Sequence, residues 1–256
     1  RRRLLAKRII PHFLLKGKRL VKGTNFGRFV DVGDPVSQAM IYDAQGADEI
    51  IIVDIDASRE GRIIDTNIID QILKQCRLPI GAGGGIRTID DARRCFGAGA
   101  DKIIVNTQAV LNPAFVSELA AEFGSQSIVV SLDVRRNGTN NYDLYICSGE
   151  QMIDIMPHDI IKKLVDYGAG EFIITTIDGE GTLKGFDCDL YSSLRESINV
   201  PLIASGGAGS YDDIANLFEK TDSDACAIGK MLFLRDYDIV RIKSYLKWKK
   251  VLTREA

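Results

Sequence analysis

Length, composition and charge describe an ordinary globular chain. It has 256 residues, of which 45% are hydrophobic and 27% charged, and its formal net charge is −2. These values exclude a strongly basic nucleic-acid-binding protein and a disordered chain, so we expect no nucleic-acid partner. No apolar run approaches the ~18 residues of a membrane span. Since no secretory leader pattern is present either, we expect a cytoplasmic protein without membrane contact.

Metal and thiol chemistry have little support in the composition. The five cysteines show no CxxC spacing, and the chain has two isolated histidines. An odd number of unpaired cysteines predicts reduced thiols, and two distant histidines do not make a zinc site. We expect no metal and no cofactor, and we expect Cys147 and Cys226 to fill apolar space.

Apolar runs of strand length alternate with amphipathic segments of helix length along the chain. The expected strands are residues 8–15, 49–55, 79–82, 102–105, 127–133, 171–177, 201–204 and 225–228. The expected helices are residues 34–45, 66–76, 88–96, 113–123, 157–167, 188–197, 210–219 and 236–247. Eight such units in about 250 residues predict a closed (β/α)8 TIM barrel, with an open doubly wound sheet as the alternative.

An internal repeat favours the closed barrel over the open sheet. Residues 78–106 and 200–230 share a strand, a glycine-rich turn and a helix start, and their matching residues lie 122 positions apart. Examples are Gly84 with Gly206 and Asp91 with Asp213. A single repeat of this length divides the chain into two halves, residues 5–123 and 124–247. We therefore predict one barrel domain over residues 1–256, built from two half-barrels.

The repeated glycine turns are candidate phosphate sites. Glycine allows backbone N–H groups to approach a phosphate, and the following helix start favours an anion. One site per half would suit a ligand with a phosphate at each end. The alternative is that the glycines only form tight turns. The candidate residues at these strand ends are Gly85, Asn106, Thr107, Thr175, Gly181, Gly206, Gly207, Gly229 and Lys230.

Asp133 is the candidate acid/base residue. It ends an apolar strand, at the face of a barrel where catalytic groups gather. We consider two alternatives for it, a general acid/base and a structural partner of Arg135 or of the next loop. Asp54 also ends a strand, and we expect it to be structural.

Four charged residues begin predicted strands and would meet at the opposite face of the barrel. They are Arg8, Glu49, Lys102 and Glu171. Since their signs alternate, we expect a ring of salt bridges that closes this end of the barrel.

The chain resembles the cyclase subunit of imidazole glycerol phosphate synthase, a (β/α)8 enzyme with a half-barrel repeat. The resemblance covers most of residues 5–246. It rests on motifs that include LAKRII at residues 5–10, VKGTNF at 21–26, DVGDPV at 31–36, GGGIRT at 83–88, DGEGT at 178–182 and IASGGAG at 203–209.

The resemblance implies a partner and a route for ammonia. A glutaminase subunit would dock at the N-terminal face as a heterodimer, and its ammonia would pass Arg8, Glu49, Lys102 and Glu171 into the barrel. Asp101 would lie at the partner interface. At the C-terminal face, ammonia would attack a bisphosphorylated ribulosyl nucleotide precursor. Gly85, Asn106 and Thr107 would bind one phosphate, and Gly206, Gly207, Gly229 and Lys230 the other.

Three positions depart from the family pattern. The family uses one aspartate at the end of strand one and another at the end of strand five. Asp133 keeps the second, but Leu14 stands at the position of the first. Glu180 stands where aspartate is usual, and Lys230 where a serine-like residue is usual. This pattern resembles a group of paralogues that work with a glutaminase in the amidination of surface sugars.

Three functions follow as hypotheses. In the first, the chain conducts ammonia for the amidination of a surface-polysaccharide sugar, without the acid at Leu14. In the second, it is the cyclase subunit of the histidine pathway, with another group in place of that acid. In the third, it is a non-catalytic activator of a glutaminase.

Overall fold

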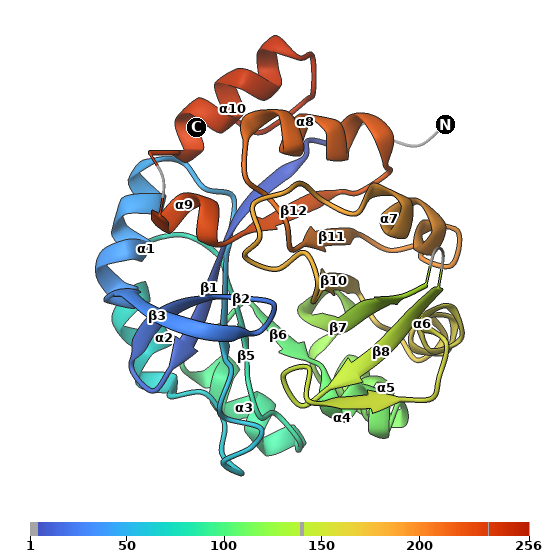
Figure 1. Ribbon diagram of the computed structural model, residues 1–256. Coiled ribbons are helices and arrows are strands. Elements are labelled where there is room, and N and C mark those ends of the chain that lie inside the picture. Colours follow the sequence, from blue (N-terminus) through green and yellow to red (C-terminus); the bar gives the residue numbers. More distant parts are fainter. Residues whose placement is uncertain (1–4, 139–140, 235, 256) are drawn as a thin grey trace.

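The computed structural model describes residues 5–138, 141–234 and 236–255. Its parallel strands form one closed ring surrounded by helices (Figure 1). In ring order these strands are β1 (Arg8–Lys16), β4 (Ile50–Asp54), β5 (Ile80–Gly83), β6 (Lys102–Val105), β7 (Ile128–Asn137), β10 (Glu171–Thr176), β11 (Leu202–Ser205) and β12 (Ala225–Ile228). Since β10 pairs with β7 and β12 pairs with β1, the barrel is closed. The (β/α)8 prediction is confirmed, and the open sheet is excluded.

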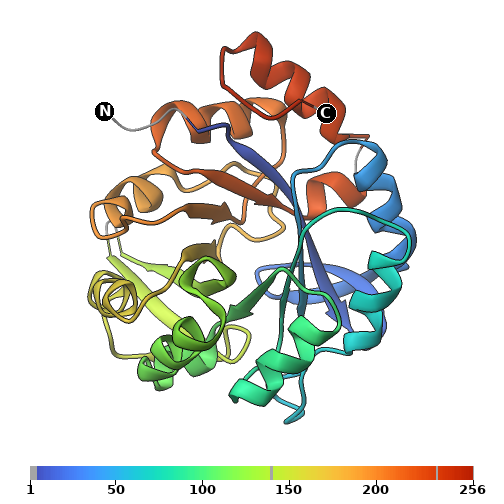
Figure 2. The ribbon, with the colours of Figure 1, turned by 180° about the vertical axis from the view of Figure 1, so that it is seen from behind.

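Helices cover the outside of the ring (Figure 2). They are α1 (Pro35–Ala44), α2 (Thr66–Leu73), α3 (Ile89–Gly97), α4 (Thr107–Leu111), α5 (Ala114–Phe123), α6 (Pro157–Asp166), α7 (Cys188–Arg195), α8 (Tyr211–Lys220), α9 (Lys230–Leu234) and α10 (Ile239–Trp248), with the short 3-10 turn η1 (Ser125–Ser127). No helix in the described ranges is long and apolar enough to cross a membrane.

The repeat is visible in the local structure of the two glycine turns. Thr88 caps α3 by accepting from the Asp91 backbone, and Ser210 caps α8 by accepting from the Asp213 backbone. Each of the two turns has glycines with positive φ, for example +117° at Gly84 and +94° at the matching Gly206. Such φ values favour glycine, so the repeat keeps the same turn in both halves.

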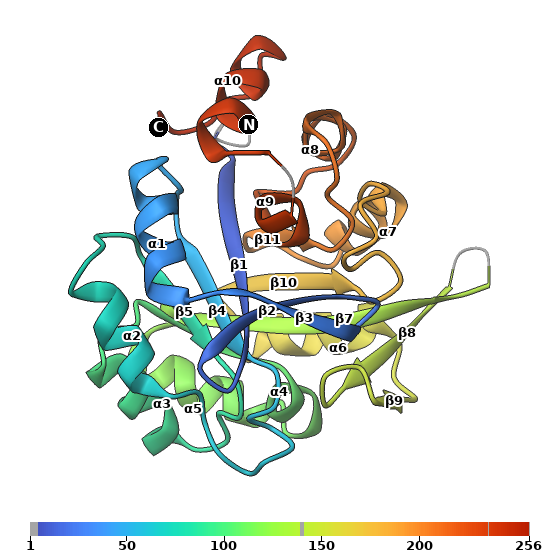
Figure 3. The same cartoon turned by 60° about the vertical axis from the view of Figure 1, so that its left-hand side comes forward.

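Two additional hairpins lie over the C-terminal face of the barrel (Figures 1 and 3). The first is β2 (Arg19–Thr24) with β3 (Gly27–Gly33), and β2 pairs with the end of β1. The second adds β8 (Asn141–Ile146) and β9 (Gln151–Ile153) to the end of β7.

Alternate residues of each barrel strand point inward, which divides the interior into layers. The lowest layer holds Arg8, Glu49, Lys102 and Glu171, at or next to the starts of strands. The next layer is apolar, and its buried residues pack together as one cluster: Ile10, Ile51, Ile104, Val129, Ile173, Ile203, Ala225 and Ala227. Polar side chains line the interior again toward the C-terminal ends of the strands. The apolar layer therefore separates the pocket at this end from the charged residues at the other end.

Candidate functional site

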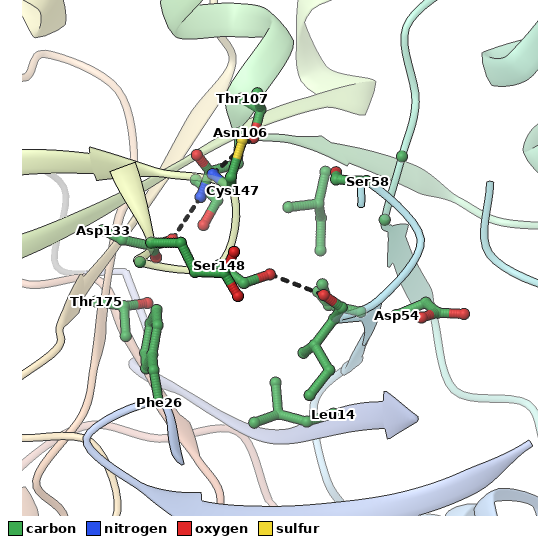
Figure 4. A pocket seen from close by; sticks show the side chains of 18 of the residues that line it. Leu14, Phe26, Asp54, Ser58, Asn106, Thr107, Asp133, Cys147, Ser148 and Thr175 are labelled. Atoms are coloured by element: carbon green, nitrogen blue, oxygen red, sulfur yellow. Dashed lines mark hydrogen bonds between the residues drawn. The ribbon is translucent and has the colours of Figure 1, made fainter. Parts of the chain in front are cut away.

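The C-terminal ends of the barrel strands and both hairpins enclose a pocket of about 370 Å³ (Figure 4). Leu14 of β1, Asn106 after β6, Asp133 of β7 and Thr175 of β10 line it. The hairpins add Phe26 and a turn of three residues, Cys147, Ser148 and Gly149. A mixed apolar and polar cavity of this size fits a small-molecule ligand.

Asp133 is the buried carboxyl of this pocket, with 6% of its surface exposed. Burial raises its pKa to about 7, while a hydrogen bond from Asn106 Nδ2 to Oδ2, at 2.8 Å, opposes the rise. A carboxyl with this pKa can both take and give a proton near neutral pH. Arg135 does not neutralise it, because the Arg135 guanidinium faces Asp178 at 3.7 Å instead. The structural alternative that paired these two residues is therefore wrong.

Leu14 occupies the corresponding position on β1, between Val21 of β2 and Val53 of β4. Its side chain borders the pocket (Figure 4). The end of β1 therefore presents an apolar surface where Asp133 presents a carboxyl. The two half-barrels therefore differ at this position, with a leucine in the first and an aspartate in the second.

The first glycine turn lines the pocket beside Asn106 and Thr107. Gly85 has φ +70°, and a Cβ there would lie 1.8 Å from the Arg62 carbonyl oxygen. Close packing against that loop therefore requires glycine, whether or not a phosphate binds. Thr107 Oγ1 accepts a hydrogen bond of 3.1 Å from the Cys147 backbone. Cys147 thus borders the pocket instead of filling apolar space, whereas Cys226 is fully buried as expected.

Three arginines on the rim give this side of the pocket a positive character. Arg59, Arg87 and Arg135 all line it. Arg59 pairs with Asp56 and with Glu150, the latter at 2.7 Å, and Arg87 donates to the Ser58 carbonyl oxygen at 3.1 Å. Arginines held in place by such contacts suit an anionic ligand. Sequence reasoning did not place Arg59 and Arg87 here because both come from irregular loops, and it named Arg135, at the end of β7, only as a possible partner of Asp133.

The predicted residues of the second half lie outside the lining of this pocket. Gly181, Gly229 and Lys230 lie against β2 instead, whereas Gly206 packs against Thr176 and Gly207 against Gly185. Lys230 Nζ donates to Thr24 Oγ1 at 2.7 Å. A Cβ on Gly181 would lie 2.0 Å from the Gly23 carbonyl oxygen, and one on Gly207 would lie 2.0 Å from the Gly185 carbonyl oxygen. A second phosphate site here remains a prediction.

Lys22 of the hairpin is the buried cation nearest this region, with 1% of its surface exposed. Its Nζ donates to the His12 carbonyl oxygen and lies 4.9 Å from the centre of the Phe233 ring. Burial lowers the pKa of Lys22 to about 8. Burial, together with Lys22, also lowers the pKa of His12 to about 3, so this histidine is neutral at pH 7.

The four predicted floor residues form a continuous ring at the N-terminal end of the barrel. Lys102 Nζ lies 2.8 Å from Glu49 and 2.8 Å from Glu171. Arg8 also pairs with both glutamates, at 3.0 Å for Glu49. Burial raises the pKa of Glu49, and the Lys102 charge opposes that rise. We name Arg8, Glu49, Lys102 and Glu171 the four-charge ring; its geometry agrees with the expected salt bridges.

Asp101 lies on the same face as the four-charge ring, immediately before β6, and is exposed. Its side chain accepts a hydrogen bond of 2.9 Å from the Ile80 backbone. Asp224 makes the same contact with the Leu202 backbone, at 2.9 Å, in the other half. Asp101 therefore has a local structural role in addition to the interface role that the resemblance implies.

No group of three or more histidine, cysteine, aspartate or glutamate side chains in the described ranges could hold a metal ion. The polar groups that line the pocket include carboxyl, amide and guanidinium groups. Such groups bind anions and transfer protons.

The barrel, its buried carboxyl and its four-charge ring define a (β/α)8 protein with a carboxyl-lined pocket at one end and a ring of salt bridges at the other. A model of the family described as "Histidine biosynthesis protein" matches residues 8–238. Proteins named imidazole glycerol phosphate synthase subunit HisF are similar over nearly their whole length. The protein from Leuconostoc mesenteroides is 42% identical over 244 residues, covering 95% of this chain and 96% of the relative.

Two further proteins named imidazole glycerol phosphate synthase subunit HisF are similarly related to this chain. The Alkaliphilus metalliredigens protein is 37% identical over 95% of this chain and 96% of its own length. The Dictyoglomus turgidum protein is 41% identical over 98% of this chain and 99% of its own length. The chain therefore belongs to the histidine biosynthesis protein family, as a HisF-like cyclase-type subunit.

Proposed function

We propose that this chain is an ammonia-dependent cyclase subunit that acts on a phosphorylated substrate in the pocket. The observation that carries the proposal is the buried Asp133 carboxyl, whose pKa of about 7 lies where acid/base catalysis is most effective. The names of the relatives favour the histidine-pathway reaction over sugar amidination. The rim arginines and the Asn106–Thr107 turn support a phosphorylated substrate.

We further propose a glutaminase subunit as the source of the ammonia, in a heterodimer. The partner would cover the N-terminal face, near Asp101. The apolar layer between the four-charge ring and the pocket supports a route for neutral ammonia through the barrel. A charged floor opposes the entry of ions and bulk water, and opening one of its four salt bridges would admit a small neutral molecule.

The direct test supplies the isolated chain with an ammonium salt and the bisphosphorylated ribulosyl nucleotide precursor. Formation of the imidazole product at ordinary enzyme rates, with a loss of about 10²–10⁴-fold in Asp133→Asn, is the expected result. Complementation of a histidine auxotroph by the chain with its glutaminase is the matching test in cells. Absence of product from a folded protein would rule the proposal out.

Leu14 favours one second candidate, the sugar-amidination role without cyclisation. An apolar side chain at the end of β1 cannot transfer a proton, so a barrel that only delivers ammonia would tolerate it. This candidate predicts glutamine hydrolysis by the complex without imidazole formation. It also predicts that Asp133→Asn leaves the delivery of ammonia unchanged.

A further inference from the structure

Three buried carboxyl groups line the pocket: Asp133, the structural Asp54 and Glu180. Glu180 follows β10, has 9% of its surface exposed and lines the same cavity as Asp133 and Leu14. Its backbone is fixed on both sides: its N–H donates to the Thr176 carbonyl oxygen at 2.9 Å, and its carbonyl oxygen accepts from Asn25 at 2.8 Å.

The side chain of Glu180 has no comparable anchor. Among the described residues, no hydrogen bond or ion pair holds its carboxyl group. Asp54, the other carboxyl at this end of the barrel, differs because Arg62 Nη1 contacts it at 2.5 Å and backbone N–H groups of the next turn donate to it. A buried carboxyl without a partner is costly to a fold, and such groups are enriched at functional sites.

Burial and two nearby lysines act on Glu180 in opposite directions. Lys22 of β2 and Lys230 of α9 favour its ionised form, and burial outweighs them, so that its pKa is raised. In turn, the electrostatic effect of Glu180 contributes to the raised pKa of Asp133, after burial as the main cause. Two carboxyls that influence each other in one pocket titrate as a pair.

We propose that Glu180 is the second acid/base residue of this pocket and acts with Asp133 in the place left by Leu14. The inference rests on the proposed function. Two features carry it: the missing carboxyl at the end of β1 and the unpartnered carboxyl that borders the same cavity from the end of β10.

The pair provides the proton transfers that ammonia addition requires. As a C–N bond forms between ammonia and a carbonyl carbon of the substrate, one carboxylate accepts a proton from the nitrogen. The other carboxyl group donates a proton to the carbonyl oxygen, which gives a carbinolamine. The two groups then exchange roles: the first donates its new proton to the hydroxyl group, the C–O bond breaks and water leaves, and the second takes one more proton from the nitrogen to give the imine. Two protons have moved from nitrogen to oxygen, no electrons are transferred, and the pair is back in its starting protonation.

The first experiment measures ammonia-dependent turnover against pH for the full chain, Glu180→Gln and the exposed control Glu118→Gln on α5. We expect Glu180→Gln to lose about 10²–10⁴-fold in rate and one limb of the pH profile. Glu118→Gln should keep the wild-type rate and both limbs of the pH profile. Adding Leu14→Asp to Glu180→Gln should restore part of the rate, because a carboxyl returns to the end of β1. A Glu180→Gln enzyme with an unchanged rate and profile would overturn the inference.

The second experiment separates this inference from the proposed function. Titration of ¹³C-labelled carboxyl groups gives the pKa of Asp133 without any substrate. We expect that pKa to fall in Glu180→Gln, because a neighbouring like charge is removed; an unmoved value overturns the pair. If the wild-type chain turns over no precursor but the Asp133 pKa falls in Glu180→Gln, the proposed cyclase function is wrong and the inferred carboxyl pair is supported. Should Glu180→Gln fail to fold, the wild-type titration decides: two coupled carboxyl groups titrate in two separate steps, and two independent single-step curves overturn the pair.

Discussion

Asn106 Nδ2 donates a 2.8 Å hydrogen bond to Asp133 Oδ2 across the ends of the neighbouring strands β6 and β7. This amide orients the carboxyl group and favours its ionised form, while burial favours the neutral form. The balance keeps the pKa of Asp133 near the pH at which a proton can move in either direction.

Removing that hydrogen bond should shift the pH dependence of the reaction. In Asn106→Ala, we expect the pKa of Asp133 to rise by about one pH unit, the scale of one hydrogen bond to a charged group. The pH–rate limb that reports Asp133 should move upward by the same amount. The exposed Asn112→Ala is the control and should leave the profile in place. An unmoved limb in Asn106→Ala would show that the amide does not tune the carboxyl.

Burial of Asp133 should also appear in the pH dependence of folding stability. Its pKa is about 7 in the folded protein, against about 3.9 in an unfolded chain. Between these values the folded state holds a proton that the unfolded state releases, so this residue's contribution to stability falls as pH rises through the window. The replacement amide in Asp133→Asn titrates in neither state. We therefore expect the variant to gain stability over wild type from about pH 5 to pH 8, by up to about 4 kcal/mol.

Denaturant unfolding at several pH values measures this difference. The slope of the stability difference against pH is the informative quantity, because the substitution also has a constant effect on packing. A difference that does not change with pH would mean that Asp133 is ionised throughout.

The four-charge ring should contribute more to stability than an exposed ion pair of the same charge type. Lys102→Met leaves Glu49 and Glu171, with 3% and 4% of their surfaces exposed, facing each other with Arg8 alone. Breaking a buried network in this way costs about 3 kcal/mol. Lys74→Met, which breaks the exposed Lys74–Asp70 pair of 2.6 Å, should cost below about 1 kcal/mol. Equal losses in thermal or denaturant unfolding would contradict a buried network.

Two glycines with almost the same φ separate the effect of crowding from that of backbone conformation. Gly85 has φ +70°, and Gly61 has φ +69°. A Cβ at Gly61 would meet nothing within 4 Å, whereas one at Gly85 would meet the Arg62 carbonyl oxygen at 1.8 Å. We expect Gly61→Ala to cost about 1 kcal/mol, the strain of a left-handed residue. Gly85→Ala should cost several times more in the same unfolding experiment, and it should weaken binding of inorganic phosphate if the turn forms an anion site.

Strand periodicity and the 122-residue repeat were sufficient to predict the closed barrel and the positions of its strand ends. Lys102–Val105 and Ala225–Ile228 were predicted to the residue, because both runs begin after a turn and end where the apolar sequence stops, before Asn106 and Gly229. Asp133, Asn106 and Thr175 were placed at one end of the barrel for the same reason: parallel strands present their C-terminal ends together.

The sequence alone did not reveal the two features that depend on loop packing. Lys22 on β2 is buried against the His12 carbonyl oxygen and the Phe233 ring, and no local sequence pattern predicts a buried lysine. Glu180 stood out in the sequence only as a departure from aspartate. Its role depends on the absence of a partner and on the cavity it borders, and both are properties of the folded chain.

Asp101 and Asp224 provide a matched pair for the proposed glutaminase interface. Each accepts a 2.9 Å hydrogen bond from a backbone N–H at a neighbouring strand start, worth about 1 kcal/mol, and Asp224 also pairs with Arg195 at 3.2 Å, so Asp224→Ala should lose at least as much stability as Asp101→Ala. Only Asp101→Ala should weaken binding of the glutaminase, because only that side chain is assigned to the interface. Binding measured by titration calorimetry, beside unfolding of each variant alone, makes the comparison. If both variants bind the partner as the wild type does, Asp101 has only the structural role of accepting the Ile80 hydrogen bond, and the partner does not bind through this side chain.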